Sequence, residues 1–121
     1  MLNIYTEHIG NLAIIECDGR IASAKAASRL GEAVTAEVDA EAVVVDLTGV
    51  DVVNRSALKM FAFLQRWGQT HDVQLKMFGP THAVRDRLRR AKLDVAGLHE
   101  MIVILARAEE QEQKFTCDRA A

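Results

Sequence analysis

The spacing of apolar residues along the chain has two periods, and each predicts a different element. A period of two predicts a half-buried strand, whereas apolar residues at i, i+3 and i+7 predict one face of a helix. Residues 2–21 therefore predict two short strands joined near the segment HIGN, and the second should be the more buried. Ser23 then caps a predicted helix that runs to about Ala36.

The segment AVVVDL, residues 42–47, is the strongest predicted strand of the chain. Its apolar residues are consecutive, as in strands buried on both faces, so we expect it to be central and covered on both sides. A helical pattern follows Asn54 and continues to about Trp67. The segment HDVQLKMFG, residues 71–79, then alternates and predicts the next strand.

The last part of the chain predicts one more helix and one more strand. Thr81 is the expected cap of a helix over the segment GPTHAVRDRLRRAK. The inward positions of this helix are expected to be Val84, Leu88 and Ala91. The segment MIVIL, residues 101–105, predicts a final short strand. After Ala106 the chain becomes polar, which predicts a short helical extension or a loose tail.

Strands that alternate with helices predict an α/β fold. We expect a mixed, mainly parallel sheet of four or five strands, flanked by about four helices. The length of 121 residues suits one domain, and the pattern contains no internal repeat or linker. We place this domain at residues 2–105 and a polar extension or tail at residues 106–121.

The composition excludes several classes of partner. Half of the residues are apolar and the net charge is −2, which gives no general affinity for nucleic acid or for an anionic membrane. No apolar run reaches the roughly 20 residues that span a bilayer, so we expect no direct membrane insertion. The first residues do not resemble a signal peptide, which predicts a cytoplasmic protein. The basic run VRDRLRRAK has no interleaved aromatic residue, and a solvated helix face is favoured over a nucleic-acid patch.

The sequence contains no pattern of catalytic or metal-binding residues. Its four histidines are scattered, and it has neither a phosphate-binding glycine loop nor a serine in a nucleophile elbow. Asp46 and Asp51 lie near the end of the central strand, but a turn acid and a solvated acid explain them more simply. Cys17 should be buried, Cys117 should be a free thiol, and no disulfide between them is expected. We therefore predict a protein that is not an enzyme and has no cofactor.

The helix after Asn54 has two apolar faces. The first should pack on the sheet and consists of Ala57, Phe61 and Leu64. The second is a stripe formed by Met60, Phe63 and Trp67. Packing against a neighbouring helix is the favoured explanation of this stripe, and a partly exposed patch for a protein partner is the alternative.

The start of this helix breaks a local rule. Asn54 is a good N-cap, and Arg55 is then the first helical residue. Because a helix N-terminus carries about half a positive charge, an exposed cation there is unfavourable by about 0.3–1 kcal/mol, whereas an anion is favoured. Arg55 either extends into solvent or forms an anion-attracting corner, and a broken local rule can mark a functional site.

Three segments of the sequence resemble the STAS domain family, which has the fold of bacterial anti-sigma factor antagonists. They are DGRIAS, AVVVDLTGVDVVNRSALKMFAFLQRWG and VQLKMFGPTHAVRDRLRRAKLDV, within residues 2–105. The resemblance implies a mixed sheet flanked by helices and a non-enzymatic switch. It also implies that, in phosphorylatable members, the serine after a motif aspartate is phosphorylated by an ATP-using anti-sigma kinase. This phosphorylation releases the partner, and a phosphatase restores binding.

The chain departs from this motif at the decisive place. The motif positions are held by Asn54, Arg55, Ser56, Ala57 and Leu58. Arg55 stands where the resemblance places the phosphoacceptor serine, and an arginine has no hydroxyl to phosphorylate. Ser56 and Thr48 are the remaining candidates for phosphorylation, although the DLTGV segment around Thr48 is also typical of a turn.

The resemblance leads to three functional hypotheses. The first is a regulatory domain that binds an anti-sigma factor or a similar kinase-like ATPase through Asn54–Leu58, with an output that phosphorylation does not switch. The second is a cytosolic subunit that binds the ATPase of an ABC-type lipid transporter. The third is a sensor of small molecules or anions, with Arg55 at the site. The stripe of Met60, Phe63 and Trp67 would serve either protein partner, and the resemblance also allows a homodimer.

Overall fold

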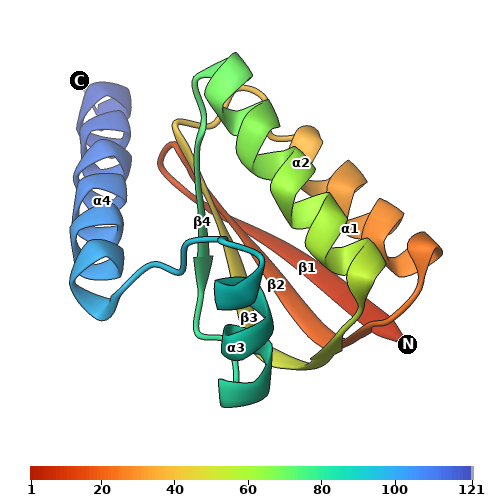
Figure 1. Cartoon of the computed structure of the whole chain (residues 1–121). Coiled ribbons are helices and arrows are strands. Elements are labelled where there is room, and N and C mark those ends of the chain that lie inside the picture. The colour runs from red at the N-terminus through yellow and green to blue at the C-terminus, as the bar shows by residue number, and fades with distance from the viewer. Residues whose placement is uncertain (121) are drawn as a thin grey trace.

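The four strands form one sheet, which lies between two helices on one face and a third helix on the other (Figure 1). The computed structural model describes the backbone of residues 1–120 and the side chains of residues 1–114, so the expected free thiol of Cys117 lies outside the described side chains. The elements are β1 (Leu2–Ile9), β2 (Leu12–Ile21), α1 (Ala24–Thr35), β3 (Ala42–Val53), α2 (Arg55–His71), β4 (Gln74–Phe78), α3 (His82–Arg90) and α4 (Leu98–Ala120).

The strands are arranged in sequence order, β1-β2-β3-β4. β1 pairs with β2 in antiparallel orientation, whereas β2 with β3 and β3 with β4 are parallel. The predicted α/β fold with a mixed, mainly parallel sheet is therefore confirmed. Because the parallel strands end at the same edge, α1, α2 and α3 all begin at this edge of the sheet (Figure 1).

Residues of β3 enter both hydrophobic cores, as the sequence predicted for a central strand. Val43, Val45 and Leu47 belong to the main core, which lies between the sheet and the helices α1 and α2. Val44 belongs to a smaller core with Leu12, on the face covered by α4. Alternate side chains of one strand point to opposite faces, so the consecutive apolar run fills both cores.

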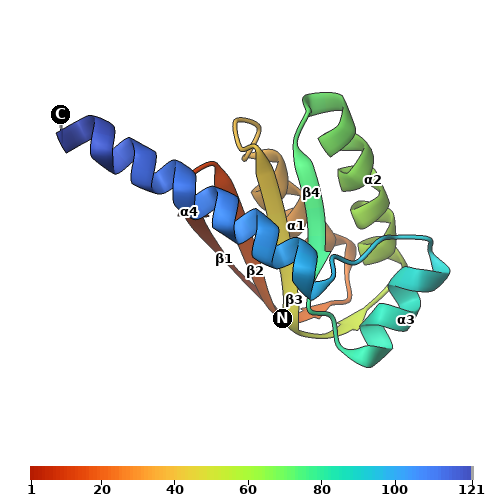
Figure 2. The same ribbon diagram turned by 90° about the vertical axis from the view of Figure 1, so that its left-hand side faces the viewer.

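The predicted final strand at residues 101–105 is wrong, because these residues lie in α4. Met101 and Ala108 are buried, and Ile104 packs against the same core as Leu12 and Val44. The spacing of these three residues is helical, and it covers the second face of the sheet (Figure 2). A short apolar run does not by itself distinguish a strand from a buried helix segment, which explains the error.

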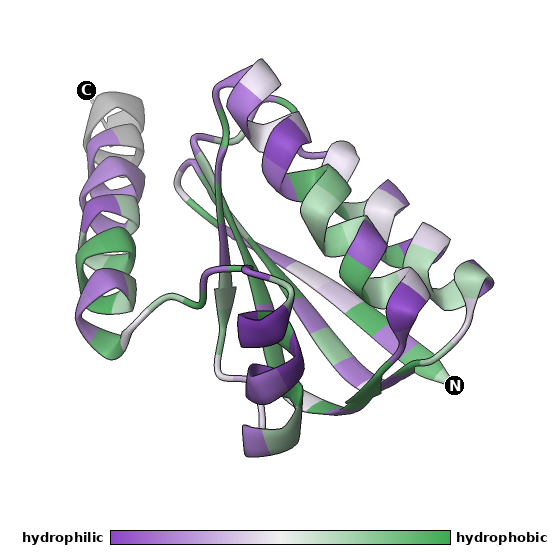
Figure 3. Ribbon diagram, in the orientation of Figure 1, coloured by the Kyte–Doolittle hydropathy of each residue, from purple (hydrophilic) through white to green (hydrophobic). Residues whose placement is uncertain are grey.

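The helix α3 begins as predicted but ends earlier. The hydroxyl of Thr81 accepts a hydrogen bond from the backbone N–H of Val84 at 3.4 Å, and both Val84 and Leu88 are buried. The expectation that Ala91 points inward is wrong, since Ala91 is the C-cap and is exposed. Most of α3 is hydrophilic (Figure 3).

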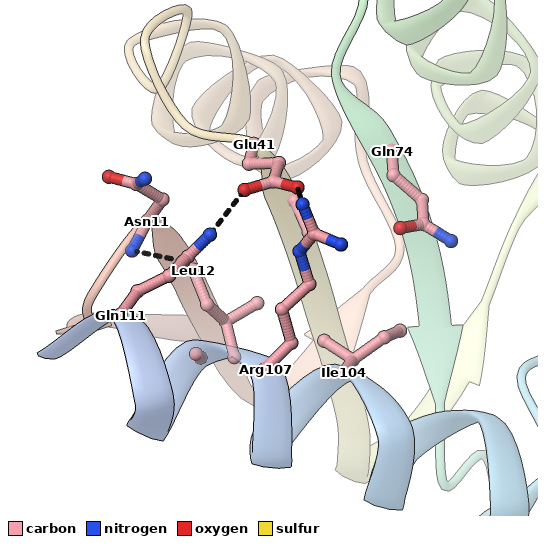
Figure 4. A pocket seen from close by; sticks show the side chains of 9 residues that line it. Asn11, Leu12, Glu41, Gln74, Ile104, Arg107 and Gln111 are labelled. Carbon is pink, nitrogen blue, oxygen red and sulfur yellow. Dashed lines mark hydrogen bonds and ion pairs between the residues drawn. The ribbon is translucent and has the colours of Figure 1, made fainter. Parts of the chain in front are cut away.

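Polar contacts hold α4 against the opposite edge of the sheet (Figure 4). The carboxylate of Glu41 forms an ion pair with the guanidinium of Arg107 at 2.6 Å and accepts a hydrogen bond from the amide of Gln111 at 2.5 Å. The side-chain oxygen of Gln111 accepts from the backbone N–H of Asn11 at 3.2 Å. The cavity enclosed by this group measures about 30 Å³, which is room for about one water molecule. The group is therefore a structural clamp.

Candidate partner-binding site

Asn54 fixes the start of α2 at the edge of the sheet where the parallel strands end. Its side-chain oxygen accepts a hydrogen bond from the backbone N–H of Ala57 at 3.0 Å, as an N-cap requires. Its own backbone N–H donates to the carbonyl oxygen of Ile21 at 3.1 Å. The second contact connects the start of α2 to the last residue of β2. Hydrogen bonds therefore hold Asn54 both to the first turn of α2 and to the neighbouring strand.

Arg55 is exposed and is the first residue of α2. The first turn of the helix contains no acidic residue. Among the residues whose side chains are described, no carboxylate forms an ion pair with Arg55. The guanidinium therefore adds its positive charge to the positive end of the helix dipole.

The other four residues of the predicted site differ in exposure. Ala57 is completely buried, so its contribution is to packing. Asn54, Ser56 and Leu58 are half-buried, and Leu58 packs against the main core. The structure therefore brings all five residues together in one helical turn, and Arg55 is the one that extends furthest into solvent.

Thr48 is exposed, but its hydroxyl group already has a partner. Both the backbone N–H and the hydroxyl of Thr48 donate to one carboxylate oxygen of Asp46, at 3.0 and 2.8 Å. The methyl group of Thr48 lies against Gly79, which has a φ of +69°. Thr48 lies within β3, so these contacts hold it next to Gly79, the residue that follows β4.

Burial protects the thiol of Cys17, which lies on β2. Desolvation and, to a smaller extent, the charges of Asp46 and Glu16 raise the pKa of Cys17 to about 12. The expectation that Cys17 is buried is confirmed. A thiol with this pKa is neutral at physiological pH and is a poor nucleophile.

The three residues of the apolar stripe on α2 have different surroundings in the structure. The sulfur of Met60 packs against α1, where a Cβ added to Gly31 would lie 2.7 Å from it. Trp67 is half-buried and stacks on His71, with ring centroids 5.0 Å apart. Phe63 remains 50% exposed. Helix packing therefore accounts for Met60, and Phe63 is the member of the stripe that is accessible to a partner.

The described part of the chain lacks two other classes of feature. It contains no group of three or more histidine, cysteine, aspartate or glutamate side chains that could hold a metal ion. It also contains no helix that is both long enough and apolar enough to cross a membrane.

One cluster of cations, formed by Arg20, Lys25 and Arg29, was not predicted from the sequence. Arg20 lies on β2, and the other two lie on α1, so the cluster forms only when the strand and the helix come together. The signal available in the sequence was the spacing of Lys25 and Arg29, which places both on one face of a helix.

The chain is thus an α/β domain with a mixed sheet, helices on both faces and a helix start at the edge where its parallel strands end. The chain belongs to the STAS domain family, which matches residues 3–110. STAS domains with the fold of anti-sigma factor antagonists are typically binding domains without catalytic activity. No curated protein sequence is similar enough to this chain to count as a relative.

Solved structures of anti-sigma factor antagonists have the same fold. The anti-sigma factor antagonist from Mycobacterium paratuberculosis is 19% identical, with a TM-score of 0.73, over 88% of this chain and 95% of the other. The unphosphorylated anti-sigma factor antagonist SpoIIAA is 11% identical, with a TM-score of 0.69, over 83% of this chain and 93% of the other. Phosphorylated SpoIIAA from Bacillus is 10% identical, with a TM-score of 0.66, over 85% of this chain and 99% of the other.

Proposed function

We propose that this STAS domain is a regulator that binds a protein partner through the start of α2, residues Asn54–Leu58, and that phosphorylation does not switch this binding. The observation that carries the proposal is Arg55, an exposed cation without a described partner, at the position where the family resemblance places the phosphoacceptor. An arginine has no hydroxyl, and its charge is opposite to that of a phosphate.

The charge of Arg55 defines the partner surface that would fit. A guanidinium forms two parallel hydrogen bonds with a carboxylate, so the partner should present an aspartate or glutamate to the helix start. Phe63, which lies about two turns further along α2, offers a separate apolar contact to the same partner. An anti-sigma factor with a kinase-like ATPase domain is the proposed partner, and the similar solved structures of anti-sigma factor antagonists support this choice.

In this function the protein is not an enzyme and needs no cofactor of its own. It acts in the bacterial cytoplasm and controls transcription by partner switching, because an anti-sigma factor bound to it cannot hold its sigma factor. The level of the domain, rather than its phosphorylation, then determines how much anti-sigma factor is captured.

Copurification from the host organism tests the proposal. The tagged full chain is compared with the variants Arg55→Glu and Arg66→Glu, since both residues are exposed on α2 and Arg66 lies about three turns from the helix start. We expect a kinase-like anti-sigma ATPase with the wild type and with Arg66→Glu, and its loss with Arg55→Glu.

The other outcomes identify what is wrong with the proposal. An ABC-type ATPase in place of the anti-sigma factor would assign the domain to lipid transport. Phosphate on Ser56 or Thr48, accompanied by release of the partner, would show that the output is switched after all. Equal binding by all three proteins would remove Arg55 from the interface.

A further inference from the structure

A cavity of about 440 Å³ lies beside the start of α1. It opens between the first residues of β1, the end of β2 and the first turns of α1. The residues that line it are Met1, Leu2, Arg20, Ala22, Ser23, Lys25, Ala26 and Arg29. Pockets for small organic ligands measure about 300–1,000 Å³, so this cavity has the volume of a binding site.

The charges around this cavity all have the same sign. Arg20, Lys25 and Arg29 line it, and no carboxylate does. Arg29 is held in place, because its guanidinium donates to the carbonyl oxygen of Leu2 at 2.7 Å. Among the described side chains, Arg20 and Lys25 form no ion pair. Three cations around one cavity repel one another, and an anion placed between them would relieve this repulsion.

Apart from Ser23, the N-cap of α1, the rest of the lining is apolar. Leu2 and Ala26 are buried and form part of the wall, and Ala22 contributes another methyl group. A second cavity of similar size, about 310 Å³, is lined by Arg85 and Arg89 but also by Asp94. The carboxylate of Asp94 offsets part of the positive charge there. The first cavity differs because its lining contains cations but no carboxylate.

We propose that the cavity lined by Arg20, Lys25 and Arg29 binds a small organic phosphate. The phosphate would be held by charge-assisted hydrogen bonds from the three cations, and guanidinium groups suit its oxygens particularly well. The organic part would lie against Leu2 and Ala26. The proposal does not rest on the proposed function, because none of these residues belongs to the α2 site.

Binding at this cavity would affect the start of α2, the proposed partner-binding site. Ile21 ends β2, one residue after Arg20, and its carbonyl oxygen accepts the backbone N–H of Asn54. A bound anion would therefore lie on the same strand end that holds the start of α2.

Amide NMR titration of the full chain tests the proposal, with inorganic phosphate and phenyl phosphate as probes. We expect saturable shifts at residues 20–29 with both probes, and a lower Kd for phenyl phosphate because of its apolar ring. The variants Lys25→Gln and Arg20→Gln should each raise the Kd about tenfold, the effect of losing one charge-assisted hydrogen bond. The control Arg89→Gln removes a charge from the second cavity and should leave the Kd unchanged. The spectra also show directly that each variant is folded.

Several results would overturn this inference. Shifts that do not saturate, or an equal loss of affinity in Arg89→Gln, would show unspecific attraction to surface cations. A loss of binding in Arg55→Gln but not in Lys25→Gln would place the anion at the start of α2. Equal affinity for both probes would show that the cavity does not bind the organic part of a ligand. Binding only to vesicles of phosphatidic acid would show that the site recognises a membrane surface and not a soluble ligand.

Discussion

Replacing Arg55 with glutamate should stabilise the fold, although the same change is expected to abolish partner binding. Arg55 is the first residue of a 17-residue helix, it is exposed, and no acidic residue in the first turn compensates its charge. The variant Arg55→Glu replaces an unfavourable charge at the helix N-terminus with a favourable one. Asn54 remains in place as the N-cap, so the helix start itself is preserved.

The size of the effect follows from the helix dipole. Removing an exposed cation from the first turn gains about 0.3–1 kcal/mol, and adding an anion gains a similar amount. The free energy of unfolding should therefore rise by about 0.6–2 kcal/mol at low ionic strength. For a domain of this size, about 4 °C in Tm corresponds to 1 kcal/mol. Because the Debye length shrinks to about 3 Å at 1 M salt, most of the gain should disappear there.

Urea denaturation at low salt and at 1 M salt measures this effect. The control Arg66→Glu makes the same charge change in the interior of α2, where we expect a shift within about 0.5 kcal/mol. A destabilised Arg55→Glu, or an equal gain in both variants, would refute the argument that Arg55 opposes the helix dipole. If Arg55→Glu is more stable and yet does not bind its partner, unfolding cannot explain the lost interaction.

Three further predictions concern the fold and the proposed absence of a phosphorylation switch. Above pH 9 the Cys17 thiol loses its proton in the unfolded chain but keeps it in the folded chain, where its pKa is about 12. The free energy of unfolding should therefore fall by up to about 1.4 kcal/mol per pH unit. Urea titrations at pH 8 and 10.5 should show this slope in the wild type and a smaller one in Cys17→Ala. Gly79→Ala should destabilise by about 1–3 kcal/mol, because its φ is +69° and the added Cβ meets the methyl group of Thr48; adding Thr48→Ser should restore part of the Tm, and full recovery would exclude backbone strain. Arg55→Ser should accept phosphate from the copurified kinase-like partner, which mass spectrometry detects, whereas an unmodified serine would argue against the assignment of position 55.

Most of the sheet was predictable because its signals are local. The period of two in β2, the consecutive apolar run of β3 and the caps Ser23, Asn54 and Thr81 all lie within a few residues of the elements that they define. Asn54 and Arg55 at the start of α2 were found in the same way, whereas the full set Asn54–Leu58 came from the resemblance to the family motif. Their use as a partner-binding site stays a prediction.

The features that the sequence did not predict depend on residues that are far apart in the chain. The apolar run at residues 101–105 lies in a helix that buries the apolar sheet face around Leu12 and Val44. The run itself contains no sign of that distant face. The clamp that joins Asn11 to Gln111 spans 100 positions. Local patterns carry no information on such contacts.

The docking of α4 has a consequence for how the protein is made. Each strand pairs with the one synthesised before it, so β1 to β4 and the helices α1 and α2 can assemble while the chain is still emerging from the ribosome. The face of the sheet around Leu12 and Val44 stays uncovered until residues 101–108 follow. A nascent chain whose β4 has left the ribosome, but whose residues 101–108 have not, would therefore present a nearly complete domain with one bare apolar face. Such nascent chains should be the ones that chaperones capture, and release should coincide with the appearance of Ala108.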